Sequence, residues 1–425
     1  MPEGDRMDAE RRIVVQPPEP DMTPATLIER ARALRPMLRA QQEEADKRGY
    51  YTDEVHEAIK AAGLYRTVQP RMFGGYQFDM ETLFKIVIEI SRGHPSSGWC
   101  YTLATSHALL VGAHFSEKAQ AEIFGPDGDF RAPHRAPPAG KWEKAEGGWR
   151  VSGTWAYSSG SPVSTHFIGG AVIPNDDGSP RGINFIVRRD QVKILEDSWG
   201  GDTALGMQGS GSHAVVVDNV FVPDDHIITS SVLLSSEYAP EGTVGLRLHG
   251  DVSFLGVVGG IYQATFGAIL TGTARAAIDE YEEIIKTSKS YHVPGLPRTE
   301  EAETQRVLGK AIQLTDAAEA LTLRCATIYR EQCENWAATG KPITTEDTLR
   351  LWGVAQETCF MACEAVTMLF HTAGVRAAGR GQKLQRYFRD IQMYLVHPSS
   401  QSVISSSIAQ LELGVPMQAF GGRGK

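Results

Sequence analysis

Hydrophobic residues recur at helical spacing in the first quarter of the chain and again through most of its second half. Thr23-Pro24 is typical of a helix start, with a capping hydroxyl followed by proline in the first turn. The pattern predicts N-terminal helices over residues 25–38, 42–62, 79–91 and 99–114, with Pro95-Ser96-Ser97-Gly98 as a break before the last. Four longer apolar helices are predicted over residues 252–287, 300–338, 345–374 and 384–413, which is the pattern of a helical bundle.

The middle of the chain has a different pattern. Short β-rich runs cover residues 149–154, 166–172, 182–187 and 214–222, and turn residues such as Asp177-Gly178 separate them. The sequence therefore predicts an α+β protein. We expect a flexible tail over 1–22, an N-terminal α-helical domain over 23–125, a β-domain over 126–228 and a C-terminal four-helix bundle over 229–425. The surplus of apolar residues on the bundle helices indicates a face buried between subunits.

Composition excludes several classes of function. The chain has 425 residues with 42 Lys+Arg and 51 Asp+Glu, a net charge of −9 with no basic block, so we expect no nucleic-acid partner. No segment is apolar over the length that a membrane span requires. The five cysteines lack paired spacing and are expected to be free thiols in a reducing cytoplasm. No His, Asp or Glu cluster has metal-ligand spacing, and no phosphate-binding GK[ST] motif or nicotinamide-binding GxGxxG motif is present.

The segment Gly153-Thr154-Trp155-Ala156-Tyr157-Ser158-Ser159-Gly160 is the most informative one. A flat heteroaromatic ligand needs rings over one face, a small hydrogen-bond donor at its edge and a backbone that comes close. On an extended chain Trp155, Tyr157 and Ser159 would share one side, and Ser158 would face the other. A hairpin arm with a buried tryptophan and a Ser-Gly turn explains the same residues, and on this segment alone it is the better explanation.

Four motifs in order along the chain change that preference. They are Arg71-Met72-Phe73-Gly74-Gly75, the segment 153–160, Gly209-Ser210-Gly211-Ser212 leading to Val222-Pro223, and Gln385-Arg386-Tyr387-Phe388-Arg389-Asp390 followed by His397. With the helical, β, helical order of the domains, this set resembles the acyl-CoA dehydrogenase fold. Within that fold it is most similar to the flavin-dependent monooxygenases of two-component systems.

The resemblance implies an activity. Such a protein is the oxygenase component, which uses reduced FMN or reduced FAD and O2 to oxygenate an aromatic or polycyclic small molecule through a C4a-hydroperoxide. It implies a separate NAD(P)H:flavin reductase as partner, which agrees with the missing nicotinamide motif, and a homotetramer built as a dimer of dimers. It leaves open the substrate, hydroxylation against N- or S-oxidation, and FMN against FAD.

The same resemblance implies roles for two catalytic residues. Ser159 lies where the family presents a hydroxyl to flavin N5, and His397 lies where a histidine stabilises the hydroperoxide. An imidazole suits that role because it donates or accepts a proton near neutral pH. Without the resemblance, Ser159 reads as a turn serine and His397 as a helix-end residue.

Other residues are candidates for binding. Flavin phosphate requires positive charge and polar hydrogen atoms, and the substrate requires polar groups near the flavin. The expected flavin contacts are Trp155, Tyr157, Ser158, Ser159, Ser161 and Arg131, with Arg275 and Gly374 reaching the flavin of a neighbouring subunit; the expected substrate contacts are His94, His107 and Trp99. A structural role is the alternative explanation for each of them. Trp155 would then pack in the core, and the histidines would be buried residues that form hydrogen bonds within the protein.

The main alternative is an acyl-CoA dehydrogenase or flavin oxidase with a relocated catalytic base. Those enzymes abstract a proton with a glutamate, and the resemblance places that glutamate at one of two positions. Here the positions carry Val396-His397-Pro398 and Tyr262, without a carboxylate. A third possibility is a protein that has lost catalysis and serves in assembly, and retention of Ser159 and His397 speaks against it.

Overall fold

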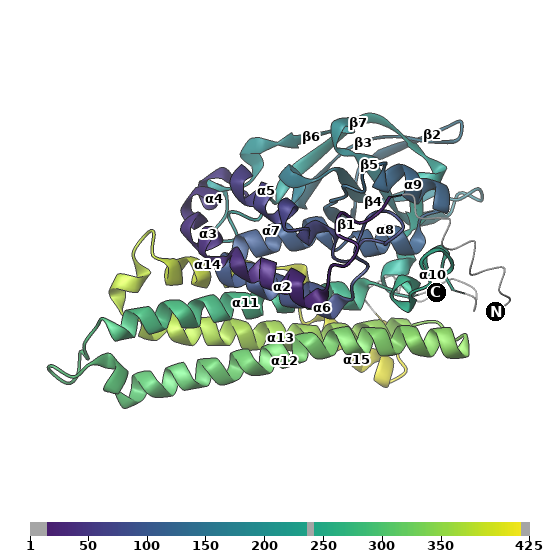
Figure 1. Ribbon diagram of the computed structural model, residues 1–425. Helices are drawn as coiled ribbons and strands as arrows, with labels where there is room; N and C mark the ends of the chain where they lie inside the picture. Colours follow the sequence, from purple (N-terminus) through teal and green to yellow (C-terminus); the bar gives the residue numbers. More distant parts are fainter. Residues whose placement is uncertain (1–14, 236–241, 418–425) are drawn as a thin grey trace.

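The computed structural model describes residues 15–235 and 242–417 (Figure 1). Its elements follow the predicted order: short helices, then two sheets, then long helices. In Figure 1 the sheets lie on one side of the molecule, the long C-terminal helices on the other, and the N-terminal helices between them. The α+β architecture predicted from the sequence is confirmed.

The N-terminal helices are α2 (Pro24–Ala33), α3 (Arg35–Ala40), α4 (Gln42–Arg48), α5 (Asp53–Ala61), α6 (Met80–Gly93), α7 (Pro95–Thr105), α8 (Ala108–His114) and α9 (Glu117–Phe124). The start of α2 is capped as expected, because the Thr23 hydroxyl accepts a hydrogen bond from the Thr26 N–H at 3.1 Å. Asp79 caps α6 in the same way, at 2.9 Å from the Thr82 nitrogen.

Three of the predicted N-terminal helices are interrupted. The segment 25–38 is divided at Leu34, between α2 and α3. The segment 42–62 is not one helix, because Gly49 ends α4 with a left-handed φ of 91° and Thr52 caps a new helix, α5. The predicted break before Trp99 is confirmed at His94, which separates α6 from α7, although Pro95 itself occupies the first turn of α7, where its missing N–H costs nothing. The predicted helix over 99–114 is divided at Ser106 and His107, between α7 and α8.

The strands are β1 (His134–Pro138), β2 (Lys141–Ala145), β3 (Gly148–Ser158), β4 (His166–Pro174), β5 (Pro180–Arg188), β6 (Val192–Leu195), β7 (His213–Pro223) and β8 (Ile227–Thr229). They form two four-stranded sheets, ordered β1-β4-β5-β8 and β2-β3-β7-β6. The Asp177-Gly178 hairpin between β4 and β5 is confirmed. A buried cluster that includes Val151, Trp155 and Phe185 joins residues of the two sheets.

The C-terminal helices are α10 (Val244–His249), α11 (Gly259–Lys286), α12 (Ala302–Thr339), α13 (Thr345–Thr372), α14 (Lys383–Leu395) and α15 (Val403–Glu412). Helices α11, α12 and α13 run side by side in Figure 1, and α11 also packs against α6. The fourth predicted bundle helix is two helices, because a turn at His397–Ser400 separates α14 from α15. Proline at 398 removes a backbone donor there, and this turn carries His397.

Residues of the C-terminal signature hold the three parts of the molecule together. Buried Arg386 on α14 donates from Nε to Asp46 Oδ2 on α4 at 2.7 Å and from Nη1 to Gln42 Oε1 at 3.0 Å. Asp390 accepts a hydrogen bond from the Met207 N–H, in the loop before β7, at 2.6 Å. These contacts fix the direction of α14 and therefore the position of the turn that follows it.

Part of the predicted tail is held against the N-terminal domain. The Val15 nitrogen donates to Met72 O at 3.1 Å, and Glu19 forms an ion pair with Arg30 at 2.6 Å. The expectation of a flexible tail is therefore wrong for residues 15–22, and its remainder, 1–14, lies outside the described residues.

All five cysteines are buried and free, as expected. No group of His, Cys, Asp and Glu within residues 15–235 and 242–417 could hold a metal ion. In the same two ranges, no helix has both the length and the apolar character needed to cross a membrane.

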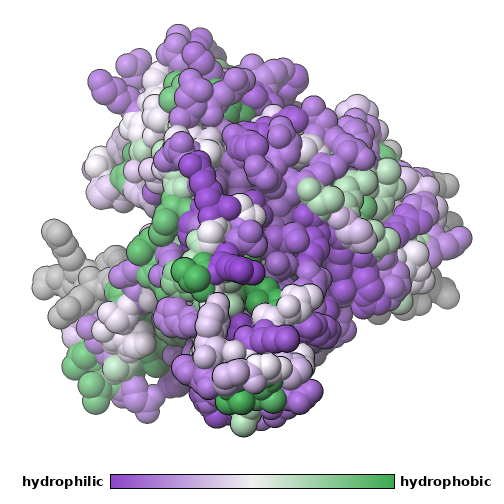
Figure 2. Space-filling view, turned by 90° about the vertical axis from the view of Figure 1, so that its left-hand side faces the viewer, coloured by the Kyte–Doolittle hydropathy of each residue, from purple (hydrophilic) through white to green (hydrophobic). Residues whose placement is uncertain are grey.

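Figure 2 shows one end of the molecule, where hydrophobic side chains gather in a recess between hydrophilic lobes.

Candidate functional site

Ser159 directly follows β3 and lies against the loop Gly209–Ser212 that leads into β7. The N–H of Gly160 donates to Ser210 O at 3.1 Å. Gly160 has a φ of 84°, and a Cβ at this position would come within 2.8 Å of Cys100 O on α7. Only glycine allows this turn to pack so closely, so the motif's Ser-Gly pair places Ser159 between β3, α7 and the loop.

The Ser159 hydroxyl belongs to a hydrogen-bonded chain of four polar groups. The Trp99 indole Nε1 donates to Ser159 Oγ at 3.0 Å, Ser159 Oγ lies 2.8 Å from Ser212 Oγ, and Ser212 Oγ lies 2.6 Å from Ser210 Oγ. Ser210 and Ser212 are both buried. An indole is only a donor, whereas each hydroxyl donates once and accepts up to twice.

The direction of this chain follows from the need to satisfy each buried hydrogen. Either hydroxyl of each pair can donate, and we assign Ser210 as the donor to Ser212, because Ser212 Oγ is the acceptor described for its hydroxyl hydrogen. Ser212 then donates to Ser159, which also accepts from Trp99. The reverse order would leave the hydroxyl hydrogen of fully buried Ser210 without an acceptor, which costs about 1–3 kcal/mol, whereas this order leaves the hydrogen of half-buried Ser159 unused. Both acceptor sites of Ser159 are therefore occupied, and its own hydrogen is free to donate to a ligand.

Three aromatic rings lie beside this donor. The ring centroids of Trp99 and Phe266 are 4.8 Å apart, those of Phe266 and His397 are 5.0 Å apart, and those of Trp99 and His397 are 5.8 Å apart. Trp99 comes from α7, Phe266 from α11 and His397 from the turn after α14. The fold thus brings Ser159 and His397, which are far apart in sequence, to the same tryptophan.

His397 is held as a neutral imidazole with a defined tautomer. Its Nδ1 accepts a hydrogen bond from the Ser399 N–H at 3.2 Å, and the Ser399 hydroxyl lies 3.0 Å from the same nitrogen. The proton must therefore be on Nε2, the nitrogen that can act as a donor. Burial lowers the pKa of His397 to about 4, and nearby Arg135 lowers it further. The ring is a neutral donor throughout the physiological pH range.

A second polar cluster lies one helical turn along α11. Tyr262 precedes Phe266 by four residues, so the two side chains share a face of the helix. The rings of His107 and Tyr262 are 5.2 Å apart, and those of His107 and His134 are 5.3 Å apart. His107 Nδ1 lies 2.8 Å from both Leu103 O and Ala132 O, so it carries the proton and leaves Nε2 as an acceptor.

Asn184 completes this second cluster. Its Oδ1 lies 3.0 Å from His134 Nε2, while its Nδ2 is buried with no hydrogen-bond partner within the described part of the chain. Burial lowers the pKa of His107 to about 4 and that of His134 to about 3. The cluster therefore offers a neutral acceptor and an unused donor close to the aromatic rings.

The structure separates the residues of the β3 motif. Trp155 is buried among the sheets and donates from Nε1 to Gly170 O at 2.9 Å, so it has no face for a ligand. Tyr157 is 61% exposed and lies 5.1 Å from the Trp199 ring. Their expected common side was wrong, because the pairing of β3 with β7 shifts register between Trp155 and Ser158. Tyr157 keeps an open ring face, whereas Trp155 belongs to the core.

Ser158 and Ser161 bond within the protein. Ser158 Oγ donates to Trp155 O at 3.2 Å, and Ser161 Oγ donates to Gly211 O at 3.2 Å. Both side chains are buried. They shape the turn on either side of Ser159 and present no free hydroxyl hydrogen, so we do not retain them as flavin contacts.

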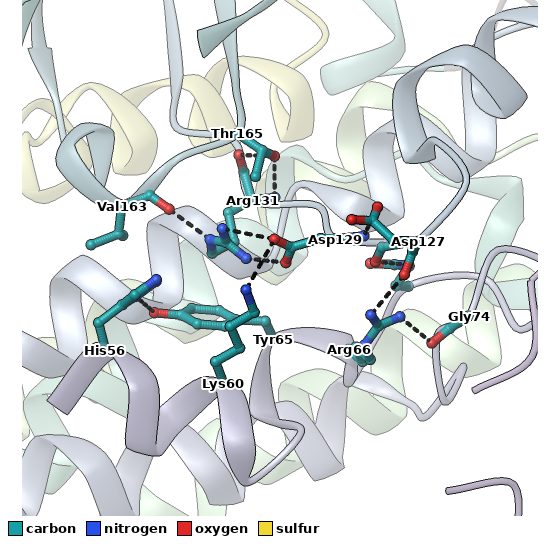
Figure 3. Close-up of polar contacts among 12 residues, drawn as sticks. His56, Lys60, Tyr65, Arg66, Gly74, Asp127, Asp129, Arg131, Val163 and Thr165 are labelled. Carbon is teal, nitrogen blue, oxygen red and sulfur yellow. Dashed lines mark hydrogen bonds and ion pairs between the residues drawn. The ribbon is translucent and has the colours of Figure 1, made fainter. Parts of the chain in front are cut away.

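Arg131 is neutralised inside the N-terminal half of the molecule (Figure 3). Its Nε donates to Val163 O at 2.6 Å, both of its Nη atoms bond the Asp129 carboxylate, and its guanidinium lies 4.9 Å from the centroid of the Tyr65 ring. The side chain is buried. A guanidinium that is already paired with a carboxylate has no free charge for a phosphate, so its expected flavin contact is replaced by a structural role.

Two predicted contacts lie on the bundle, away from Ser159. Arg275 on α11 forms ion pairs with Asp316 and Glu319 of α12, at 2.8 and 2.6 Å. Gly374 follows α13 with a φ of 93°. Neither has a contact with the Ser159 and His397 cluster, so a role for them remains a prediction that requires a neighbouring subunit.

The three predicted substrate residues have different surroundings. Trp99 lies in the Ser159 cluster, and His107 lies in the second cluster. His94 is buried next to the bundle signature instead, with Nδ1 2.8 Å from Ser97 Oγ and Nε2 3.4 Å from Asp46 Oδ1. We therefore keep Trp99 and His107 as candidates and assign His94 a structural role.

Sequence reasoning gave no role to Ser210, Ser212, Phe266 or Arg135. The two serines lie within the Gly209–Ser212 motif, so its pair of hydroxyls was the available signal. Phe266 lies four residues after Tyr262, a position that was considered only for a carboxylate. For Arg135 no local pattern distinguishes it from a surface arginine.

Acidification is expected to destabilise the protein through its buried histidines. Burial lowers the pKa of His107, His114, His166, His249 and His397 to about 4 and that of His134 to about 3. The unfolded chain binds these protons near pH 6.5, so stability is complete above that pH and is lost as pH falls toward 4. Each such group lowers the free energy of unfolding by about 2 kcal/mol between pH 6.5 and pH 5.

This expectation is tested by urea unfolding at pH 7.5 and pH 5. The free energy of unfolding should fall by several kcal/mol, and His107→Gln should reduce that fall. Replacement of exposed His292 by Gln is the matched control and should leave the pH dependence unchanged. Equal stability of the unmodified protein at the two pH values would contradict the neutral assignment of these histidines.

Comparison with known proteins identifies the family of the chain. Residues 28–127 match the family model described as acyl-CoA dehydrogenase, N-terminal domain, and residues 264–401 match acyl-CoA dehydrogenase, C-terminal domain. Together these two models cover more than half of the chain.

Several characterised relatives span nearly the full length. The oxygenase subunit HsaA of a flavin-dependent monooxygenase from Rhodococcus jostii (strain RHA1) is 28% identical over 88% of this chain and 94% of its own. The oxygenase component of p-hydroxyphenylacetate 3-hydroxylase from Acinetobacter baumannii is 25% identical over 95% of this chain and 92% of its own. The solved structure of XiaF from Streptomyces sp., in complex with FADH2 and glycerol, superposes with a TM-score of 0.82 at 22% identity, covering 98% and 99% of the two chains.

Proposed function

This chain belongs to the acyl-CoA dehydrogenase family, and on that premise we propose that it is the oxygenase component of a two-component flavin monooxygenase. Its relatives in this family include oxygenase components that are named as flavin-dependent. The protein binds reduced FMN or reduced FAD and uses O2 to oxygenate a small aromatic or polycyclic molecule. The alternative, acyl-CoA dehydrogenation, requires a carboxylate base, and no carboxylate contacts the Ser159, Trp99, Phe266 and His397 cluster within the described residues.

The observation that carries the proposal is the free hydrogen of Ser159. The order Ser210, Ser212, Ser159 directs each hydroxyl hydrogen along the chain, and Trp99 occupies the remaining acceptor site of Ser159. A group at this position can only donate to a ligand. In reduced flavin the carbonyl oxygen next to N5 is an acceptor of this kind, whereas N5 itself carries a hydrogen, so the site fits the edge of the cofactor that presents this carbonyl.

When bound, reduced flavin supplies the electrons that activate O2, and one oxygen atom goes to the substrate while the other leaves as water. The residues of this chain control that chemistry. Trp99 and Phe266 form an apolar wall that excludes water. His397 provides a neutral Nε2–H beside them, which donates a hydrogen bond to the activated oxygen without releasing a proton.

The second cluster is suited to the polar end of the substrate. His107 Nε2 accepts, and Asn184 Nδ2 donates, so together they match a hydroxyl group on an aromatic ring. Tyr262 and Phe266 connect this cluster to the oxygen-activating residues along one face of α11. The relative from Acinetobacter baumannii is named for a phenolic substrate, which supports an aromatic substrate here.

The remaining parts of the proposal concern partners. The chain has no nicotinamide-binding motif, so a separate NAD(P)H:flavin reductase supplies the reduced flavin. The protein acts as a homotetramer in the cytoplasm, and the loop around Gly374 contacts the flavin of a neighbouring subunit. Exposed Val375, next to Gly374, is 81% accessible and supports contact of this loop with another chain.

The function is tested by turnover with an added flavin reductase, NADH and ¹⁸O2. Phenols and polycyclic aromatic compounds are screened for one ¹⁸O atom per product molecule by mass spectrometry. Omission of the reductase or the flavin is the control and should abolish the product. Bleaching of a purified yellow protein by an acyl-CoA without O2 would instead establish the dehydrogenase alternative.

Replacement of Ser159 by alanine is expected to weaken reduced-flavin binding about tenfold, because one hydrogen bond to the cofactor is lost. It also leaves the Trp99 indole N–H without its acceptor, which should lower the free energy of unfolding by about 1–3 kcal/mol. Fluorescence titration and urea unfolding measure the two effects.

Ser158→Ala is the matched control for this variant. Ser158 is the adjacent residue, and its hydroxyl bonds Trp155 O inside the fold, so flavin affinity should not change. Ser212→Ala should weaken binding in the same direction as Ser159→Ala, since it removes the group that orients Ser159. Equal affinities of Ser159→Ala and Ser158→Ala would show that Ser159 does not contact the flavin.

A further inference from the structure

Arg135 on β1 is held next to the strand that leads to Ser159. Its Nε donates to Ala156 O at 2.7 Å, and Ala156 lies three residues before Ser159 at the end of β3. The side chain is half-buried. The bond from Nε fixes the plane of the guanidinium and leaves the two Nη atoms as a forked pair of donors.

The charge of Arg135 has no partner within the protein. No Asp or Glu in the described ranges forms an ion pair with it, and its only described hydrogen bond is the one to Ala156 O. Arg131, four residues earlier, shows the contrast, because both of its Nη atoms bond Asp129. Burial lowers the pKa of Arg135, and no carboxylate offsets that effect. A half-buried cation without a counter-ion is a site for an anion.

Arg135 also acts on the proposed active site. It lowers the pKa of His397, and it lowers the pKa of His134, which belongs to the second cluster. The charge of Arg135 therefore acts at both ends of the row of rings formed by His397, Phe266, Tyr262 and His107, since His134 lies beside His107. A flat ligand that receives the hydrogen bond from Ser159 and lies against this row would come within reach of the guanidinium.

We propose that Arg135 binds the anionic edge of a planar conjugated ligand in this pocket. The chemistry that it recognises is a delocalised negative charge on adjacent oxygen and nitrogen or oxygen and oxygen atoms. Two ligands of this kind could supply it: the N1–C2=O edge of the reduced flavin anion, or the carboxylate of an acidic aromatic substrate. The first source rests on the proposed function, and the second does not require flavin.

This role differs from a purely structural tie between β1 and β3. A structural arginine would serve equally well for neutral and charged ligands, whereas an anion-binding arginine discriminates between them. The oxidised flavin ring is neutral and the reduced ring is an anion near neutral pH. The ratio of the affinities for reduced and oxidised flavin should therefore change on loss of Arg135 only if Arg135 binds the anion, and not if its role is structural.

The experiment compares the unmodified protein with Arg135→Gln and Arg135→Lys. FMN and FAD are titrated anaerobically in the oxidised and in the reduced form, and benzoate and phenol are titrated without flavin. Arg135→Gln should weaken the binding of one anion, reduced flavin or benzoate, by about 10-fold or more. The affinity for the matching neutral ligand, oxidised flavin or phenol, should change by less than about threefold. Arg135→Lys should restore part of the discrimination because it keeps the charge.

Arg150→Gln is the matched control. Arg150 lies at the far end of β3, and its Nη1 donates to a backbone carbonyl, Asn219 O, at 3.2 Å. The variant removes an equal charge from β3, the strand that Arg135 contacts, and should leave all four affinities unchanged. NMR titration of the His397 ring in the flavin-free protein gives a further check, since loss of the Arg135 charge should raise the pKa of His397.

The outcomes separate the two sources and the two hypotheses. Loss of reduced-flavin binding alone assigns the flavin edge to Arg135, and loss of benzoate binding alone assigns the substrate carboxylate. Unchanged discrimination in both arms overturns the proposal, even if the protein is an oxygenase. If the unmodified protein binds no reduced flavin, the proposed function fails, and Arg135 is then judged by the benzoate arm.

Discussion

Replacement of His397 by alanine is expected to speed the release of hydrogen peroxide from the reduced-flavin complex by about 10- to 100-fold. The neutral Nε2–H of His397 is the donor placed against Trp99 and Phe266, and without it the activated oxygen loses its hydrogen bond and admits water. Reduced-flavin affinity should stay within about threefold, because the hydrogen bond from Ser159 is retained. Stopped-flow absorbance and a peroxide assay after mixing with O2 measure the rate.

The controls for this variant use pH and a distant histidine. Because the pKa of His397 is about 4, the ring should stay neutral between pH 6 and pH 8, and its contribution to peroxide release should be constant over that range. Replacement of exposed His292 by alanine should not change peroxide release. If His397→Ala and the unmodified protein release peroxide at the same rate, His397 has no part in oxygen activation.

Arg386→Ala is expected to lower the free energy of unfolding by about 3–5 kcal/mol. Arg386 and Asp46 are both buried and bonded at 2.7 Å, and removal of the guanidinium leaves the Asp46 carboxylate uncompensated. The same change releases α14 from α4, so the turn with His397 should lose its fixed position. Urea unfolding measures the first effect, and peroxide release measures the second.

Two further variants separate the charge from the packing. Arg386→Met together with Asp46→Leu removes both charges and should recover part of the lost stability, because no unpaired ion remains. Arg350→Ala breaks ion pairs with Glu346 and Glu412 on the bundle surface and should leave the unfolding midpoint unchanged. A loss of less than about 1 kcal/mol in Arg386→Ala would place this pair among ordinary surface contacts.

Local patterns predicted the parts of the fold that depend on local physics. The helical spacing of apolar residues gave α6, α12 and α13 with ends within two residues of those observed, and Thr23-Pro24 marked the start of α2. Helix α11 was predicted to start at 252, seven residues before its observed start at Gly259. The turn at Asp177-Gly178 placed the β4–β5 hairpin. Strands β1, β2, β6 and β8 escaped prediction because they are short and depend on pairing with strands that are distant in sequence.

The site was predicted in outline, and its details required the fold. Ser159 and His397 were named from motifs, and both contact Trp99 through elements that lie about 240 residues apart in sequence. Trp155 lies in the core with Val151, and the register shift between Trp155 and Ser158, which alternation does not reveal, separates Tyr157 from that side. Arg131 and Arg135 are both arginines before the β3 motif, and only the position of Asp129 distinguishes the neutralised one from the free one.

The central claim, that Ser159, Trp99 and His397 enclose a site for reduced flavin, is tested most directly by anaerobic titration of the flavin-free protein. Trp99 contacts Ser159, so its fluorescence reports the ligand. We expect reduced FMN or reduced FAD to quench this fluorescence and to bind at least about tenfold more tightly than the oxidised form. Absence of binding by reduced flavin, or preferential binding of oxidised flavin that an acyl-CoA then bleaches, would contradict the account.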